Sequence, residues 1–179
     1  RGLVNADWSQ FAGQINVTAR RAAPNVDELR VKPVGGYPNA SIHLGSRVNF
    51  YNLNGGTPTY DIGELSGDAG SLLSTPGGNS GGQPVNWRVG GLNTSSEFAG
   101  NIMDQTGLIK VGTGMLTLSG TNTSTRFTAV GGGTLAVTGL INTTNFVVVS
   151  NFATLALSGE ITASRVQINS GGTLTGCGT

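Results

Sequence analysis

Large apolar residues recur at a fixed interval along the C-terminal half of the chain. Phrases at 115–120, 134–139 and 154–159 share one pattern of alternating large apolar and small residues, and a fourth begins at 173. One row of nearly evenly spaced anchors consists of Leu116, Leu135, Leu155 and Leu174. A second, evenly spaced row consists of Val130, Val149 and Ile168. Two apolar rows that share one repeat period predict a solenoid.

Each phrase alternates as a β-strand does. At 116–118 two leucines flank a threonine, so the large residues face one side and the threonine faces the other. Glycine or Ser-Gly ends each phrase, as expected for turns. A coil of two or three such strands uses about 19 to 20 residues, and successive coils stack their strands about 4.8 Å apart. The sequence therefore predicts an all-β parallel β-helix.

Two other all-β folds are weaker alternatives. A β-sandwich does not require so regular a period, and a β-propeller blade needs about 40 residues, roughly twice the period seen here. From the length of the chain we expect roughly eight or nine coils, which at the inter-strand spacing gives a rod about 40 Å long.

The chain divides into three regions of increasing regularity. Residues 1–39 hold a first strand and much of the charge. We interpret them as an irregular N-terminal strand with a polar cap or surface excursion, because the end of a solenoid exposes a sheet edge. Residues 40–106 are less regular coils with a Gly- and Pro-rich loop at 74–84, and residues 107–179 are the regular repeats.

Composition narrows the choice of partners. Charged residues make up 11% of the chain, the formal net charge is +1, and 30 of 179 residues are glycine. Such a balance gives no electrostatic reason to expect nucleic acid or an anionic membrane as a partner. No apolar run approaches the ~18 to 20 residues of a membrane helix, so we expect no membrane insertion by this segment. The lone Cys177 is interpreted as a core residue or, less favoured, a thiol for an intermolecular bond.

A family resemblance accompanies the regular repeats. The stretch 107–123 reads GLIKVGTGMLTLSGTNT, and GGGTL follows at 131–135. This is similar to the autotransporter-associated β-strand repeat, also called the passenger-associated transport repeat, with a core match at 107–139 and a wider one over about 60–179. Ser124, Arg126 and Cys177 depart from the residues usual in the family. The resemblance implies a right-handed parallel β-helix in a secreted or surface-displayed bacterial protein, and it implies no activity.

Few residues suit catalysis. Hydrolysis or lytic cleavage of a polysaccharide needs clustered carboxylates, or a metal with a basic residue, in a groove. Asp61, Glu64 and Asp68 are the only acidic cluster, and the spacing of Asp61 and Glu64 predicts opposite faces of a strand. We interpret all three as solvated. The sole histidine, His43, is predicted to face outward, and the sequence does not allow a Ser or Cys partner to be identified for it. We therefore predict no enzyme, and we assign no catalytic residue, cofactor or metal ligand.

The aromatic residues offer the one candidate binding feature. Trp87 alternates with Val85 and Val89, which predicts a core position. Candidate glycan contacts are Trp8, Tyr37, Tyr51 and Tyr60. An exposed row of such rings would suit stacking on sugars, whereas burial under the N-terminal cap is the slightly favoured alternative.

The leading expectation is a non-enzymatic extracellular structural or adhesive segment, part of a bacterial surface fibre, adhesin or stalk. Because the chain begins at Arg1, we expect a product of processing or trimming after secretion. Its expected partners are a further copy of itself, stacked head to tail through the open ends, or a cell-surface or matrix polysaccharide. The alternative is a carbohydrate-binding ancillary domain of a secreted polysaccharide-degrading enzyme. A β-helical lyase would need a carboxylate groove that the sequence does not indicate.

Overall fold

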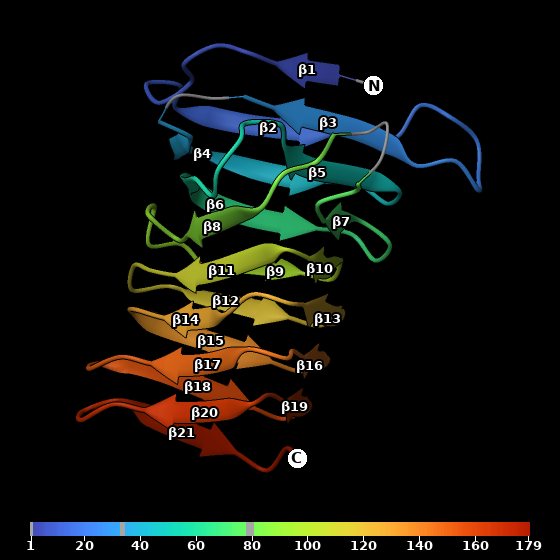
Figure 1. Ribbon diagram of the computed structural model, residues 1–179. Helices are drawn as coiled ribbons and strands as arrows, with labels where there is room; N and C mark the ends of the chain where they lie inside the picture. Colours follow the sequence, from blue (N-terminus) through green and yellow to red (C-terminus); the bar gives the residue numbers. More distant parts are fainter. Residues whose placement is uncertain (1, 33–34, 78–80) are drawn as a thin grey trace.

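The chain folds into a stack of parallel strands. The computed structural model describes residues 2–32, 35–77 and 81–179, and the regular elements within these ranges are all strands. They form a β-solenoid of about seven coils (Figure 1). The chain descends from the N-terminus in Figure 1 while its nearer strands run left and its more distant strands run right, so the winding is right-handed. The predicted fold class is confirmed.

Three stacks of strands form the sides of the solenoid, and we call them faces 1, 2 and 3. Face 3 is an eight-stranded sheet. In order, it consists of β1 (Gly2–Val4), β3 (Asp27–Val31), β5 (Val48–Asn52), β7 (Leu72–Leu73), β10 (Asn101–Asp104), β13 (Thr121–Ser124), β16 (Leu140–Asn142) and β19 (Glu160–Thr162).

Faces 1 and 2 belong to one 13-stranded sheet. Face 1 consists of β8 (Val85–Val89), β11 (Thr106–Lys110), β14 (Thr128–Val130), β17 (Phe146–Val149) and β20 (Arg165–Ile168). Face 2 consists of β2 (Gly13–Val17), β9 (Ser96–Phe98), β12 (Met115–Leu118), β15 (Gly133–Val137), β18 (Ala153–Leu157) and β21 (Thr173–Gly176). Two long strands, β4 (Tyr37–Leu44) and β6 (Thr59–Gly67), bend across the corner between these faces, and β6 pairs with both β8 and β9.

The two predicted apolar rows are aligned in register. On face 2 the row is Leu116, Leu135, Leu155 and Leu174. On face 1 the row is Val130, Val149 and Ile168. All are buried except the last of each row, Ile168 and Leu174, which are 37% and 51% exposed because they lie in the last described coil. The ladders therefore form the core, as the period predicted.

The solenoid has fewer coils than the roughly eight or nine predicted, because its N-terminal coils use more residues. Ile15 aligns with Ile42, and Gly67 aligns with Phe98, so each of these coils is longer than a regular repeat. Surface excursions between strands take up the difference. Residues 1–39 contribute β1, β2, β3 and the start of β4, so the predicted boundary at 40 falls inside a strand. Positions 78–80 of the predicted 74–84 loop lie outside the described residues.

Candidate functional site

The aromatic residues of the N-terminal half gather inside the solenoid. Tyr51 and Trp87 are 0% exposed, Tyr37 is 2% exposed and Tyr60 is 4% exposed. Ring contacts run from Tyr37 to Phe50 at 6.2 Å, from Phe50 to Trp87 at 4.7 Å and from Trp87 to Tyr60 at 5.6 Å between centroids. The core position of Trp87 is confirmed. The three tyrosines are not available as glycan contacts, because a sugar cannot reach rings that pack inside the coils.

Burial raises the pKa of two of these tyrosines, Tyr37 and Tyr60. Burial raises the pKa of Tyr37 well above its ordinary value, and the neighbouring Tyr60 adds to the rise. Burial also raises the pKa of Tyr60, opposed by a hydrogen bond from Asn54. The Tyr60 hydroxyl accepts from Asn54 Nδ2 at 2.6 Å and donates to Asn52 Oδ1 at 3.2 Å.

Trp8, the fourth candidate glycan contact, closes the N-terminal end of the core. It is half-buried, and its ring lies 5.3 Å from Phe11 and 6.3 Å from Tyr37 between centroids. Together with Ile15 and Leu29 it lines an apolar cavity of about 250 Å³ within the first coil. Its ring is thus part of an interior surface rather than of an outer row.

The acidic residues of β6 do not form a cluster. Ile62 and Gly63 are both buried, so the alternation breaks where β6 bends across the corner. Asp61 and Glu64 consequently both face outward, on different faces of the solenoid, and the prediction of opposite sides of one strand is wrong. Asp61 forms a two-point ion pair with Arg88, with Nη2 and Oδ2 2.7 Å apart.

His43 has polar partners that the sequence did not reveal. Its Nδ1 lies 3.0 Å from Ser66 Oγ, and its Nε2 lies 3.5 Å from Asp68 Oδ1. Register places His43 beside Ser66 in the next coil, which explains the contact. The outward direction predicted for His43 is confirmed. The three side chains lie on the open outer surface, half-buried or exposed, and line none of the cavities described here.

Lys110 lies in the apolar row of face 1, between valines of the adjacent coils. It is 1% exposed. Its ammonium group donates to the carbonyls of Val111 at 2.6 Å, Gly112 at 3.2 Å and Gly132 at 3.3 Å. Burial lowers the pKa of Lys110, because a charge loses its hydration inside the coil. The side chain therefore ties the turn after β11 to the turn after β14.

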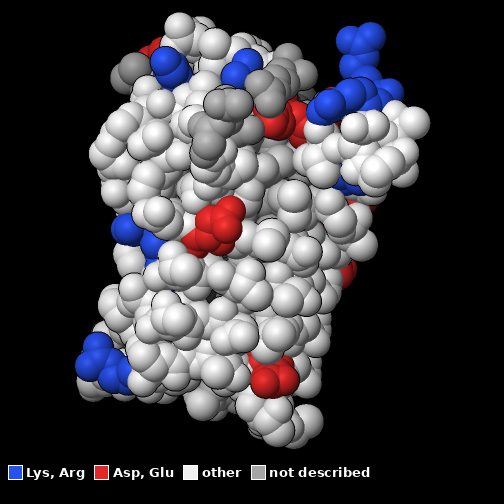
Figure 2. All heavy atoms as spheres, turned by 45° about the vertical axis from the view of Figure 1, so that its right-hand side comes forward, with Lys and Arg blue, Asp and Glu red and all other residues white. Residues whose placement is uncertain are grey.

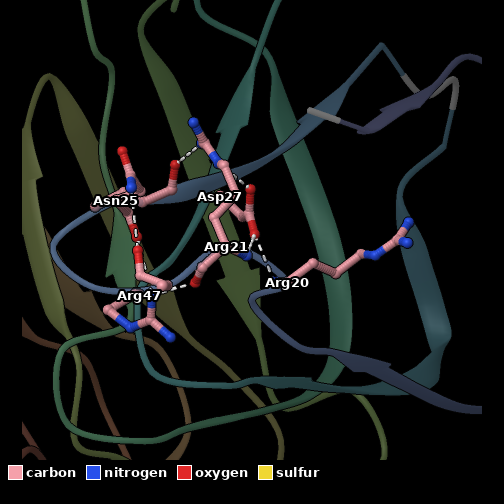
Figure 3. A network of polar contacts seen from close by, with 7 residues as sticks. Arg20, Arg21, Asn25, Asp27 and Arg47 are labelled. Carbon is pink, nitrogen blue, oxygen red and sulfur yellow. Dashed lines mark hydrogen bonds and ion pairs between the residues drawn. The ribbon is translucent and has the colours of Figure 1, made fainter.

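A network of polar contacts holds the excursion between β2 and β3 (Figure 3). The Asp27 carboxylate accepts from the main-chain N–H groups of Arg20 at 2.6 Å and Arg21 at 3.0 Å, and from the Arg21 guanidinium at 2.7 Å. The bonds from Arg21, its main-chain N–H first, hold the pKa of Asp27 well below its ordinary value. Arg47 donates to the carbonyls of Arg21 at 2.5 Å and Asn25 at 3.2 Å. The excursion is thus fastened to the next coil.

Two phenylalanines stack on the outside of face 1. The rings of Phe127 and Phe146 lie 5.6 Å apart at an angle of 9°. Arg126 lies over Phe127 at 5.9 Å, and Arg165 lies over Phe146 at 5.8 Å. The ring faces are covered by these neighbours, so the pair is not a platform for a sugar. The sequence analysis missed this column, although its spacing matches the period of the repeats.

A polar groove of about 530 Å³ follows the corner between faces 3 and 1. Its lining residues are Thr75, Asp104, Gln105, Thr125, Arg126 and Asn145. Cross-coil bonds fix it: Thr75 N–H donates to Asp104 Oδ2 at 3.3 Å, and Gln105 N–H donates to Thr75 Oγ1 at 3.0 Å. The Thr125 hydroxyl donates to the Asp104 carbonyl at 3.0 Å, and Asn145 Nδ2 donates to the Thr125 carbonyl at 3.4 Å.

This groove was not predicted from the sequence. A signal was nevertheless present, because Gln105, Thr125 and Asn145 follow one another at equal intervals that match the repeat period. A polar row at the repeat period marks one corner of successive coils, just as the apolar rows mark the core.

The remaining surface carries little charge. Figure 2 shows charged side chains gathered near the N-terminal end and otherwise scattered over an uncharged face. Cys177 is exposed beyond β21, so its expected core position is wrong. Among the described residues no three His, Cys, Asp or Glu side chains are grouped so as to hold a metal ion. No helix in the described ranges is long and apolar enough to cross a membrane.

Comparison of the chain with known protein families, curated proteins and solved structures finds no match.

Proposed function

We propose that this chain is a non-enzymatic structural or adhesive segment of an extracellular or surface-displayed bacterial protein, similar to an autotransporter passenger. The observation that carries the proposal is the register of the lower coils, in which Leu116, Leu135 and Leu155 occupy one position in successive turns. Such a repeat gives length and an even, weakly charged surface. Solenoids of this kind present extended surfaces to their surroundings.

The absence of enzymatic activity is part of the proposal. His43, Ser66 and Asp68 are the arrangement nearest to a nucleophile with a base, and they lie on an open sheet surface. Nucleophilic catalysis needs a place where the substrate can be held beside the nucleophile and its developing charge can be stabilised. The cavities described above supply no such place near Ser66.

Head-to-tail stacking is the assembly that we propose for the segment. Val166, Ile168 and Leu174 continue the inward rows and are 41%, 37% and 51% exposed. A further coil in the same register would cover them, and strand edges with free N–H and C=O groups pair readily. A second copy would supply that coil through a head-to-tail contact that extends rather than closes.

Sedimentation velocity and negative-stain electron microscopy test the proposed stacking. We expect rods that lengthen with concentration, and we expect Leu174→Asp to abolish them because it places a charge in the contact. Phe152→Asp is the matched control, since Phe152 is 87% exposed on a turn at the side of the solenoid.

Monomers at every concentration would contradict stacking. The chain would then be a spacer that does not assemble with itself. Covalent labelling of Ser66 by a fluorophosphonate would contradict the non-enzymatic assignment.

A further inference from the structure

The corner groove balances hydrogen-bond donors and acceptors. The Asp104 carboxylate only accepts, the Arg126 guanidinium only donates, and the Gln105 and Asn145 amides do both. One negative and one positive charge offset each other. A phosphate or another anion would need an excess of positive groups, and the described residues offer no cluster of metal ligands. The balance matches a neutral molecule with many hydroxyl groups.

The lining side chains are placed where a ligand can reach them. Asp104 and Gln105 are both exposed. The Gln105 side chain makes no hydrogen bond in the described part of the chain, so its amide can bind an incoming hydroxyl group. Arg126 donates through Nε to Asn86 Oδ1 at 3.1 Å, which fixes the side chain.

The groove is elongated and already formed. Its residues come from four successive coils, so it extends about 14 Å along the axis at the inter-strand spacing. Asp104 adopts a left-handed conformation, φ 58°, and bonds from Thr75 and Thr125 hold its carboxylate and carbonyl. Because such bonds already order the site, ligand binding carries only a small entropy cost for ordering it.

We infer that this groove binds a neutral, linear oligosaccharide lying parallel to the solenoid axis. The inference goes beyond the structural role, because binding at the corner does not require the open ends to stack. It also differs from the expected aromatic platform, whose three tyrosines are buried: the contacts are polar, from Asp104, Gln105, Arg126 and Asn145. Shallow polar sites bind weakly, so we expect dissociation constants on the order of 1 mM. Many copies on one surface would raise the avidity.

The test uses saturation-transfer NMR and calorimetry on the whole chain. The probes are cellotetraose, xylotetraose, mannotetraose and maltotetraose, each at up to about 10 mM, because weak sites need concentrations above Kd. Tetragalacturonate is the charged comparison. We expect binding of at least one neutral tetrasaccharide and weaker binding of the charged one, since the groove has no excess of positive groups to pair with its carboxylates.

Two variants locate the site. Gln105→Ala removes an exposed amide whose side chain supports no described bond, and Asp104→Asn keeps the shape and removes the charge. We expect each to weaken binding about fivefold to tenfold, as for loss of one or two hydrogen bonds. Gln14→Ala, an exposed glutamine on β2, is the control and should leave binding unchanged.

Three results would overturn the inference. They are no binding of any neutral probe, binding that Gln105→Ala and Asp104→Asn leave intact, and tighter binding of tetragalacturonate than of every neutral probe. Melting curves confirm that the variants fold. Loss of stacking in the Leu174→Asp variant with retained glycan binding would separate this inference from the proposed assembly.

Discussion

Lys110 and Asn122 are buried polar residues within the apolar rows, and each bonds to main-chain groups of a neighbouring coil. Lys110 reaches three turn carbonyls from within face 1. Asn122, 4% exposed on face 3, accepts from Ile102 N–H at 3.1 Å and donates to the Leu140 carbonyl at 3.2 Å. A buried polar side chain is tolerated when its partners are complete. A shift of one coil against the next would break these bonds, so both residues help to specify the register.

Replacing Lys110 by methionine tests whether its hydrogen bonds stabilise the register of the coils. Lys110→Met fills similar space but leaves carbonyls of Val111, Gly112 and Gly132 without their donor. We expect the free energy of unfolding to fall by about 1 to 3 kcal/mol, the usual effect of unsatisfied buried acceptors. Lys32→Met, at an exposed lysine, should change it by less than about 0.5 kcal/mol. Urea unfolding measures both free energies. An unchanged free energy of unfolding for Lys110→Met would contradict the proposed role of Lys110 in fixing the register.

Lys110 should also make the free energy of unfolding depend on pH, with a sign that its lowered pKa determines. The folded pKa of Lys110 is lowered by burial below its unfolded value of about 10.4. Between the two values the unfolded chain binds more protons, so this residue makes stability rise with pH. The native chain should gain stability relative to Lys110→Met as pH approaches about 10, and a constant difference would contradict a lowered pKa.

Asp27 should make the free energy of unfolding depend on pH as well, but in the acid range. Its folded pKa is lowered by bonds from Arg21 and Arg20, so its contribution is complete above the unfolded value of about 3.9 and is lost as pH falls through the folded pKa. The amide resonances of Arg20 and Arg21, followed by NMR, should titrate with a midpoint well below about 3.9. Asp27→Asn should abolish this titration. A midpoint at the ordinary value would show that the network of Figure 3 does not form in solution.

At the scale of elements, the regular strands could be predicted because two signals agree. Alternation of period two and the regular repeat interval both place Leu116 and Leu135 inward. The strands β4 and β6 bend across a corner, and there the alternation breaks: Ile62 and Gly63 are both buried in β6, and neither Pro38 nor Asn39 is buried in β4. The rule of alternate sides then fails for residues beyond the bend.

Equal substitutions in one ladder should have unequal effects. Leu135 is fully buried between coils, whereas Leu174 is 51% exposed in the last described coil. Leu135→Ala should lower the free energy of unfolding by about 2 to 5 kcal/mol through lost burial and a cavity. At a chain concentration too low for the proposed stacking, Leu174→Ala should lower it by less than about 1 kcal/mol. Chemical denaturation of the two variants measures the difference, and equal losses would mean that Leu174 is covered in solution.

At the scale of the whole molecule, the candidate groove was harder to predict than the fold because no single segment holds it. The groove collects one or two polar residues from each of four coils. Only their common interval links Gln105, Thr125 and Asn145. The aromatic residues, which are conspicuous in the sequence, instead pack against one another inside the N-terminal coils.

The parallel stacking also determines how the molecule would respond to force. Hydrogen bonds between coils run along the rod, so a pull on its two ends stretches these bonds directly and opens strands from the end inward. Each regular coil that opens removes about 4.8 Å of rod and frees about 60 Å of extended chain. Coils of equal length would give equal increments of extension. Under tension the regular repeats at 107–179 would therefore lengthen stepwise while their remaining coils stay wound.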